Sequence, residues 1–415
     1  EVLVTRHGPL VSELVPGEAR RLALQWTLYN PGAMAAPFYA INSATGWQQF
    51  RTALSRFGGP SQNVVYADVD GHIGYQATGL IPIRKTGDGT VPVPGHDGAH
   101  DWIGFVPFDR LPSILDPPSG ILATANGRIT PDDYPFLLSR NWGSPYRTAR
   151  ILEVLESGRK FTREDMLALQ MDLDSVFDHM LAELLLTAVE EVGAVSPRAQ
   201  QAADLIGEWD GRITSESAAA LILSRTRQEL QRLLLRPKLG NLADRYRWFM
   251  SSVALENIVG SRLARWLPLE FPTYDHLLVA ALEAAVKEPE APPQLAGWQF
   301  GKTNTLEITH PLFGRFPLLR RMTGTGAVAQ SGNGFTVKQV GRSFGPSERL
   351  TVDLSNLDAS TLNIVNGQSG QILSLHYMDQ WAAWLEGRTF PLPFSSTAVA
   401  RARRHELILQ PQGTK

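Results

Sequence analysis

Two histidines four residues apart are the first group in this sequence that could do chemistry. His96 and His100 stand near Asp88 and Asp97, and imidazole and carboxylate are common metal ligands. A spacing of four places two side chains on one face only in a helix. The Gly- and Pro-rich sequence around them favours an irregular loop. We therefore expect no metal site here and assign no metal-ligating residue.

Two glycine motifs come close to known signatures without meeting them. The segment Gly297-Trp-Gln-Phe-Gly-Lys-Thr303 has three residues between its glycines, whereas a phosphate loop needs four for its cradle of backbone amides. In Gly367-Gln-Ser-Gly-Gln371 the residue two places after the serine is Gln371, where a nucleophile elbow needs glycine. No nucleotide fingerprint occurs, so we expect no organic cofactor.

The composition sets limits on the class of protein. The chain has 415 residues, 43% of them hydrophobic and 19% charged, which is typical of a folded globular protein. A net charge of −2 gives no global field to attract nucleic acid or an anionic membrane. No apolar run reaches the roughly 18 to 20 residues that would span a bilayer. The absence of cysteine excludes disulfides and thiolate chemistry.

The elements that must position any site begin with a mixed region, residues 1–150. Trp47 to Phe57 has helical spacing, and Asn63 to Leu80 alternates like paired strands around an Asp70-Gly71 turn. Ile121 to Ala125 is predicted to be a short strand that ends at Asn126-Gly127. The Gly- and Pro-rich stretch from Lys85 to Gly95 predicts a surface loop of the kind that often walls a pocket.

A mainly helical region, residues 151–295, follows, and β-type sequence returns over 296–415. Thr162 with Asp165 three residues later has the form of an N-cap. Further predicted elements are helices at Ala199–Glu208, Ala218–Leu235, His276–Lys287 and Tyr377–Leu385, and a strand at Arg349–Leu354. From the residues alone we expect a large protein with both sheet and helix, and a pocket walled by loops.

Several segments, in one order along nearly the whole chain, resemble the β-subunit of the penicillin acylase family. They are Thr5-Arg-His-Gly-Pro9, Asn63 to Tyr75, Val91-Pro-Val-Pro-Gly95, Ala123-Thr-Ala-Asn126, Pro131 to Pro135, Pro145 to Ile151, Gln170-Met-Asp172, Trp209-Asp-Gly211, Gly345 to Arg349, Gly367 to Gly370, and His376 to Gln380. Each motif alone is weak, since several are turn or hairpin sequences. Their joint order makes an accidental match improbable.

The resemblance implies an α+β fold, a four-layer αββα sandwich of the N-terminal-nucleophile hydrolase type with a helical insertion, incomplete in this chain. It also implies hydrolysis of a linear amide by acyl transfer to an N-terminal serine. A free α-amine has a pKa near 8 and can take the hydroxyl proton itself, which is why such an enzyme needs no Ser-His-Asp set. The substrates implied are β-lactam N-acyl side chains or acyl-homoserine lactones, and the sequence leaves both open.

Two residues acquire catalytic roles through the resemblance. Asn126 matches the asparagine whose side-chain amide helps form the oxyanion hole, although Asn126-Gly127 alone would predict only a turn. Arg147 matches the arginine that orients the active-site asparagine and the N-terminal region, and a helix-start or surface ion pair is its alternative role. Gln62 and Asn63 match positions that approach the acyl pocket, with strand entry as the alternative.

The start of the chain departs from the family pattern. Glu1 is not Ser, Thr or Cys, and Thr5-Arg-His-Gly-Pro9 matches a point well inside the β-subunit. We therefore expect the chain as written to be inactive, and a noncatalytic relative that acts as a binding or scaffold protein is the alternative reading. The implied partners are the α-subunit and the N-terminal part of the β-subunit from one self-processing precursor. A periplasmic or secreted location is implied, as is a structural calcium whose ligands lie mostly outside this chain, with Asp132 and Asp133 equally plausible as turn formers.

Overall fold

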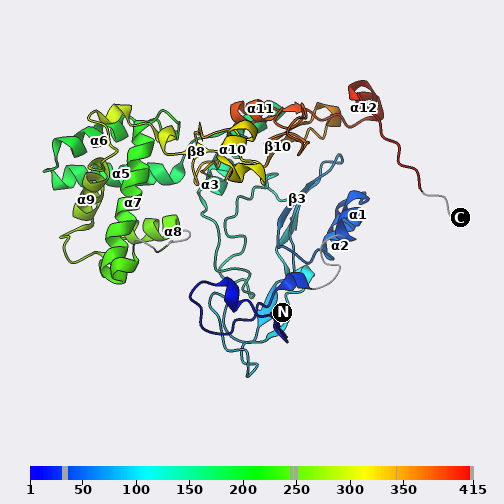
Figure 1. Ribbon diagram of the computed structural model, residues 1–415, viewed down its shortest axis with the longest axis horizontal. Coiled ribbons are helices and arrows are strands. Elements are labelled where there is room, and N and C mark those ends of the chain that lie inside the picture. Colours follow the sequence, from blue (N-terminus) through cyan, green and yellow to red (C-terminus); the bar gives the residue numbers. More distant parts are fainter. Residues whose placement is uncertain (30–35, 244–245, 247–250, 343, 412–415) are drawn as a thin grey trace. The chain divides into compact units, whose positions relative to one another are not determined.

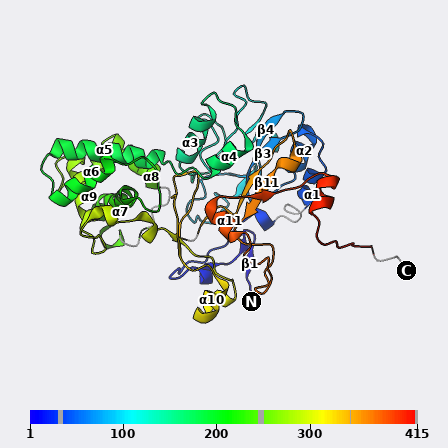
Figure 2. The ribbon, with the colours of Figure 1, turned by 90° about the horizontal axis from the view of Figure 1, so that it is seen from above.

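The computed structural model describes residues 1–29, 36–243, 246, 251–342 and 344–411. It divides into two compact units, Glu1–Gly143 and Ser144–Lys415, each with buried hydrophobic clusters of its own (Figures 1 and 2). None of the helices in the described part of the chain has the length and apolar character needed to cross a membrane.

The central element of the first unit is an antiparallel sheet of β3 (Asn63–Ala67), β4 (Ile73–Ala77) and β7 (Ser113–Leu115), in the order β3-β4-β7. Helix α2 (Trp47–Leu54) lies along one face of this sheet (Figures 1 and 2). The Trp47 ring lies 5.4 Å from that of Tyr66, and a Cβ on Gly74 would meet Trp47 at 2.6 Å. Only glycine therefore allows the helix to approach this closely.

The opposite face of the same sheet is apolar and partly exposed. Val65 pairs with Tyr75, which in turn pairs with Ile114, so the three side chains share one face. Val65 is 50% exposed and Ile114 41%, while Tyr75 packs against a buried cluster that includes Ala77. This unit therefore has a helical layer on one side of its sheet and a partly exposed apolar surface on the other.

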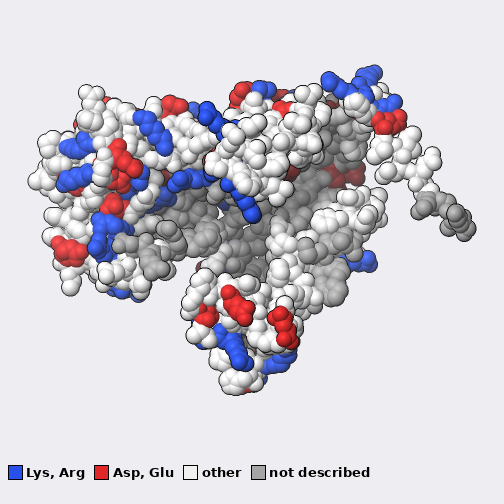
Figure 3. All heavy atoms as spheres, viewed as in Figure 1, with Lys and Arg blue, Asp and Glu red and all other residues white. Residues whose placement is uncertain are grey.

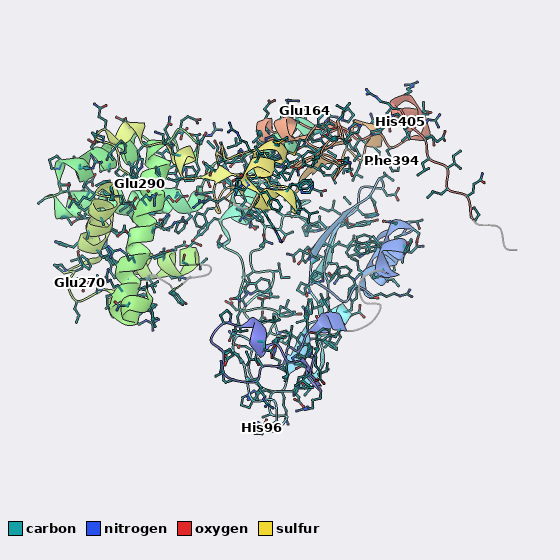
Figure 4. The ribbon with its side chains drawn as sticks, viewed as in Figure 1. His96, Glu164, Glu270, Glu290, Phe394 and His405 are labelled. Atoms are coloured by element: carbon teal, nitrogen blue, oxygen red, sulfur yellow. The ribbon has the colours of Figure 1, made fainter. Side chains whose placement is uncertain are left out.

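The remaining elements of the first unit are short. They are β1 (Val4–Thr5), β2 (Gly8–Pro9), α1 (Ala36–Asn42), β5 (Pro82–Arg84) and β6 (Trp102–Phe105), and 3-10 turns at Ser12–Leu14, Thr27–Tyr29 and Phe108–Arg110. Between β5 and β6 the chain runs without regular structure, as the Gly/Pro content predicts, and His96 lies on this loop (Figure 4).

Four helices of the second unit pack around one large apolar core. They are α5 (Val176–Val192), α6 (Pro197–Gly207), α7 (Ala218–Leu239) and α9 (Tyr274–Val286). Ser175, Ser196, Ser217 and Thr273 cap them, each side chain accepting a hydrogen bond from the backbone N–H three residues on. Leu185, Ile222 and Leu278 are at most 1% exposed. Each of these helices thus begins at a residue whose side chain caps its N-terminus.

The rest of the second unit holds short helices and strands. These are α3 (Tyr146–Leu155), α4 (Arg163–Gln170), α8 (Ser251–Leu255), α10 (Pro317–Thr323), α11 (Trp381–Glu386), α12 (Ser396–Ala402), β8 (Thr305–Leu306) and β9 (Val328–Ala329). A π-helix covers Glu256–Gly260, and 3-10 turns cover Gly240–Leu242, Ala264–Trp266, Leu295–Gly297, Phe300–Lys302, Phe313–Arg315 and Leu357–Ala359.

A second antiparallel sheet has the order β10-β11-β12, formed by Glu348–Thr351, Thr361–Ile364 and Phe390–Pro391. Its inner face is polar, because Arg349 and Asn363 stand opposite each other and are at most 1% exposed. Trp384 of α11 covers this face, with its ring 4.8 Å from the Arg349 guanidinium carbon. The other face carries Leu350, Leu362 and Phe390 side by side.

Several element predictions were wrong or too long. The strand predicted over Arg349–Leu354 covers Glu348–Thr351, and the helix indicated by Trp47 to Phe57 ends at Leu54. Ile121–Ala125 forms no strand in the structure, since no backbone hydrogen bond joins it to a neighbouring strand among the described residues. The helix predicted over Tyr377–Leu385 is confined to Trp381–Glu386, and turns replace its first four residues. The hairpin at Asp70-Gly71, the cap at Thr162 and the helices near 199, 218 and 276 are confirmed.

Candidate active site

Asn126 stands at a turn with an unusual backbone conformation. Its φ is 69°, in the left-handed region, which asparagine tolerates better than most non-glycine residues. The preceding Ala125 is buried at 8% exposure, while the Asn126 side chain is exposed. The chain is thus anchored at the buried Ala125, and the next residue is exposed.

Gly143 fixes the backbone of Asn126 from the far end of a loop. Its N–H donates to the Asn126 carbonyl oxygen at 2.6 Å. A Cβ on Gly143 would lie 2.7 Å from that oxygen and 2.8 Å from the Asn126 Cβ. The contact therefore requires glycine, and it closes residues 127–142 into a loop held at both ends.

This closed loop walls a hollow of about 360 Å³ in the first unit. The lining combines aromatic and aliphatic side chains with two arginines and two hydroxyl side chains, namely Arg128, Thr130, Tyr134, Pro135, Phe136, Leu137, Leu138, Ser139, Arg140 and Trp142. The volume lies in the range of small-molecule pockets. Asn126 is two residues from Arg128, so its turn adjoins the start of this wall.

Ion pairs and hydrogen bonds brace the wall. Arg128 Nη1 lies 2.5 Å from Asp132 Oδ1, and Arg140 Nε lies 3.2 Å from Asp88 Oδ2. The Tyr134 hydroxyl donates to the Arg110 carbonyl oxygen at 2.7 Å. Both arginines of the hollow are thus already paired with carboxylates of the first unit. A polar ligand in the hollow would contact their remaining N–H groups.

The two predicted pocket residues differ in what they do. The Asn63 side-chain oxygen accepts a hydrogen bond from the Tyr75 hydroxyl at 2.5 Å, and burial raises the pKa of Tyr75 to about 12. Gln62 is exposed, and its backbone exchanges hydrogen bonds with Thr78. Both roles are those of strand entry and pairing, although both residues belong to the same unit as Asn126.

Arg147 is the second residue of α3, in the second unit. Its side chain is half-buried, and burial lowers the pKa of its guanidinium. Next to it, the hydroxyl of Tyr146 donates to the carboxylate of Glu256, which fixes the start of α3. Arg147 therefore lies at a helix start, one of the two alternatives that the sequence left open. Its catalytic role remains a prediction.

The described residues do not by themselves supply a metal site. No three His, Asp or Glu side chains in this part of the chain gather as metal ligands would. Asp132 is committed to Arg128, and the His100 imidazole Nδ1 lies 2.8 Å from the Thr86 hydroxyl. The structural calcium implied by the family resemblance, whose ligands are expected mostly outside this chain, stays a prediction.

The comparison with protein families assigns this chain to a family. The family described as penicillin amidase matches residues 1–401. The chain belongs to the penicillin amidase family. It is 28% identical to the penicillin acylase 2 proenzyme of a Pseudomonas species over 96% of this chain and 53% of that protein. It is 29% identical to the acyl-homoserine lactone acylase QuiP of Pseudomonas syringae pv. tomato over 94% of this chain and 51% of that protein.

The fold agrees with a solved member of the family. The thermostable penicillin G acylase from Alcaligenes faecalis superimposes with a TM-score of 0.75 over 100% of this chain and 79% of that one, at 18% identity. The expected penicillin-acylase fold, of the N-terminal-nucleophile hydrolase type, is thereby confirmed. The amidase-family chain spans about half the length of the curated relatives it matches.

Two features of the site were missed at the sequence level. Tyr75, which holds Asn63, could have been found from the hairpin register, since the two lie on one face of paired strands. Gly143 gives no comparable signal, because nothing in the sequence shows that a glycine 17 residues after Asn126 returns to its carbonyl.

Proposed function

We propose that this penicillin amidase family chain is part of an enzyme that hydrolyses a linear amide, releasing a carboxylic acid and an amine. The observation that carries the proposal is the turn at Asn126. Asn126 is an exposed residue whose backbone is fixed by Gly143, where the loop that walls the hollow begins and ends. An N–H donor that is already in place before the reaction is what an oxyanion hole requires.

In this proposal the nucleophile is an N-terminal serine outside the 415 residues. Its hydroxyl attacks the amide carbonyl, its own α-amine takes the proton, and the developing oxyanion accepts a hydrogen bond from the Asn126 side-chain amide. The proton then passes to the departing amine, and water hydrolyses the acyl-enzyme. Arg147 would position the asparagine and the N-terminal region. Self-processing of one precursor and a periplasmic or secreted location belong to the same proposal.

The substrate class proposed is an N-acyl amide. Phe136, Leu137 and Trp142 provide apolar area in the hollow beside Asn126, and Arg128 and Arg140 add polar N–H donors. The relatives are named as acylases of penicillin and of acyl-homoserine lactones, so both classes should be assayed.

The test is the substitution Asn126→Ala in the full-length protein encoded by the natural gene. Loss of one oxyanion donor typically lowers kcat by about 10² to 10³, with a much smaller effect on KM. Asn141→Ala is the matched control, because Asn141 is an exposed asparagine of the same loop to which the resemblance assigns no role. Steady-state kinetics on penicillin G and on a long-chain acyl-homoserine lactone provide the readout.

N-terminal sequencing of the mature protein separates this proposal from a noncatalytic relative. A mature chain that begins with Ser and continues into Glu1-Val-Leu-Val supports the hydrolase. An aligned residue other than Ser, Thr or Cys, or an Asn126→Ala variant with unchanged kcat, would leave a binding or scaffold protein on the same fold.

A further inference from the structure

Helix α3 begins without the side-chain cap that starts each of the four core helices. Pro145 occupies its N-cap position and supplies no capping hydrogen bond. Of the ten residues of α3, only Tyr146 is buried, at 5% exposure. Arg150, one turn later, pairs with Asp172 Oδ2 at 2.9 Å. The position of the first turn, which includes Arg147, therefore depends on Tyr146.

Two aromatic rings hold the ring of Tyr146. It lies 5.1 Å from the ring of Phe177 on α5 and 5.9 Å from that of Phe335, and these two rings lie 4.6 Å apart. The guanidinium carbon of Arg227 on α7 lies 4.7 Å from the Phe335 ring. Aromatic pairs and cation–π contacts stabilise a cluster beyond the area that they bury. The start of α3 is thus packed against residues of the helical core.

A buried polar network fixes this aromatic cluster. Asp178 is 2% exposed, and its carboxylate accepts hydrogen bonds from Ser175 Oγ at 2.6 Å and Asn333 Nδ2 at 2.8 Å. The side-chain oxygen of Asn333 accepts the N–H of Phe335 at 2.8 Å. A buried network whose members are bonded to one another is rigid. Tyr146 therefore packs against a fixed surface.

The hydroxyl of Tyr146 has one partner, the carboxylate of Glu256. Glu256 is the first residue of the π-helix, and its carboxylate accepts the hydroxyl proton. Burial and this carboxylate raise the pKa of the Tyr146 hydroxyl, so it remains a donor at every physiological pH. The hydrogen bond joins two elements that lie more than a hundred residues apart in sequence.

The environment of Glu256 is unusual for a carboxylate. On the face of the molecule that Figure 3 shows, many acidic side chains stand among Lys and Arg. Glu256 forms no ion pair within the described residues, and it lines a small cavity that is apolar apart from Arg227. A carboxylate in such surroundings is costly unless it is hydrogen-bonded. The bond to Tyr146 is therefore the interaction that accounts for a glutamate at this position.

We propose that Tyr146 and Glu256 are positioning residues of the hydrolase, and that their hydrogen bond sets the place of the first turn of α3 and of Arg147. The inference rests on the proposed function, in which Arg147 positions the asparagine and the N-terminal region. Ring packing alone fixes no single atom, whereas a hydrogen bond fixes the end of the ring in both distance and direction. A small displacement of a group that orients the catalytic residues lowers the rate of the chemical step.

The experiment is Tyr146→Phe in the full-length protein, which removes the hydroxyl and keeps the ring. We expect kcat for amide hydrolysis to fall at least about tenfold, with KM nearly unchanged. Tyr274→Phe is the matched control, because Tyr274 is a tyrosine of the same unit, 3% exposed, whose hydroxyl donates to the Leu263 carbonyl oxygen at 2.7 Å. It should lose as much stability as Tyr146→Phe and keep its kcat.

Two further variants test the pair itself. Glu256→Leu should reproduce the loss of kcat, and Glu256→Gln should restore most of it, because an amide oxygen can still accept the hydroxyl proton. In an Arg147→Ala background, Tyr146→Phe should have no further effect, since it acts through Arg147. Wild-type kcat in Tyr146→Phe, or losses that simply add in the double variant, would overturn the inference.

Hydrogen exchange measured by mass spectrometry tests the pair without an activity assay. Amide exchange over residues 144–150 should be at least about tenfold faster in Tyr146→Phe than in the wild type, and unchanged in Tyr274→Phe. Equal exchange in all three proteins would overturn the inference. If Asn126→Ala leaves kcat unchanged, the hydrolase proposal fails by itself, and the exchange rates then decide whether the pair fixes the first turn of α3.

Discussion

At the scale of single residues, the contact between Gly143 and Asn126 is the most demanding feature of the candidate site. A Cβ at position 143 would lie 2.7 Å from the backbone carbonyl oxygen of Asn126. Gly143→Ala must therefore displace the turn that carries the Asn126 side chain. We expect kcat of the full-length enzyme to fall at least about tenfold, since small displacements of a catalytic group are costly. Gly207→Ala in α6 is the control, because no atom lies within 4 Å of its added methyl, and it should raise stability slightly. Equal activity of both variants would contradict the prediction.

Lys338 predicts a pH dependence of stability. It is 6% exposed, and burial together with the nearby Arg349 cation lowers its pKa from 10.5 to about 8. Between these pH values the unfolded chain binds more protons than the folded one, so the free energy of unfolding rises with pH. The gain is at most roughly 3 kcal/mol.

Urea unfolding of the full-length protein at pH 7.5 and pH 9.5 measures this gain. Lys338→Met should remove the rise, while Lys160→Met, at an exposed lysine, should retain it. If the free energy of unfolding of the wild type falls between pH 7.5 and pH 9.5 as much as that of Lys338→Met, burial does not lower the pKa of this lysine.

At the scale of elements, the sequence predicted best where the determining interactions are local. The Asp70-Gly71 hairpin follows from two residues that accept turn geometry, and Gly71 has a φ of 94°. The cap at Thr162 follows from residues three apart. By contrast, Ile121–Ala125 has strand-forming side chains but no neighbouring strand to bond with, and a strand is defined by its partner.

The N-terminal cap of α4 gives a quantitative prediction at this scale. Thr162 Oγ1 accepts a hydrogen bond from the Asp165 N–H at 3.2 Å, and the Asp165 carboxylate accepts one from the Thr162 N–H at 2.8 Å. Thr162→Ala should lower the free energy of unfolding by about 1 kcal/mol, and Thr162→Ser should leave it nearly unchanged. Chemical denaturation of the full-length protein checks this, and equal losses in the two variants would show that the hydroxyl does not cap the helix.

At the scale of the whole molecule, the candidate site could be predicted only as separate residues. The resemblance assigned Asn126, Arg147, Gln62 and Asn63 from their places in motifs, and the family assignment now supports the framework in which those roles make sense. The hollow beside Asn126 was not predictable, because it arises when Gly143 closes a loop over a distance in sequence that no local pattern records. The candidate site therefore depends on tertiary contacts that local preferences do not encode.

The same distinction predicts how the chain behaves by itself. Each three-stranded sheet has a helix on one face and apolar side chains on the other, with Val65 50%, Ile114 41%, Leu350 42% and Phe390 40% exposed. Sheet faces of this kind are normally buried against another layer, and unpaired edges promote aggregation. We expect the 415-residue chain alone to bind the dye ANS and to lose near-UV circular dichroism over a broad temperature range, whereas the full-length protein should melt sharply. A sharp melt of the isolated chain, coincident in near- and far-UV signals, would show that these faces are tolerated in water.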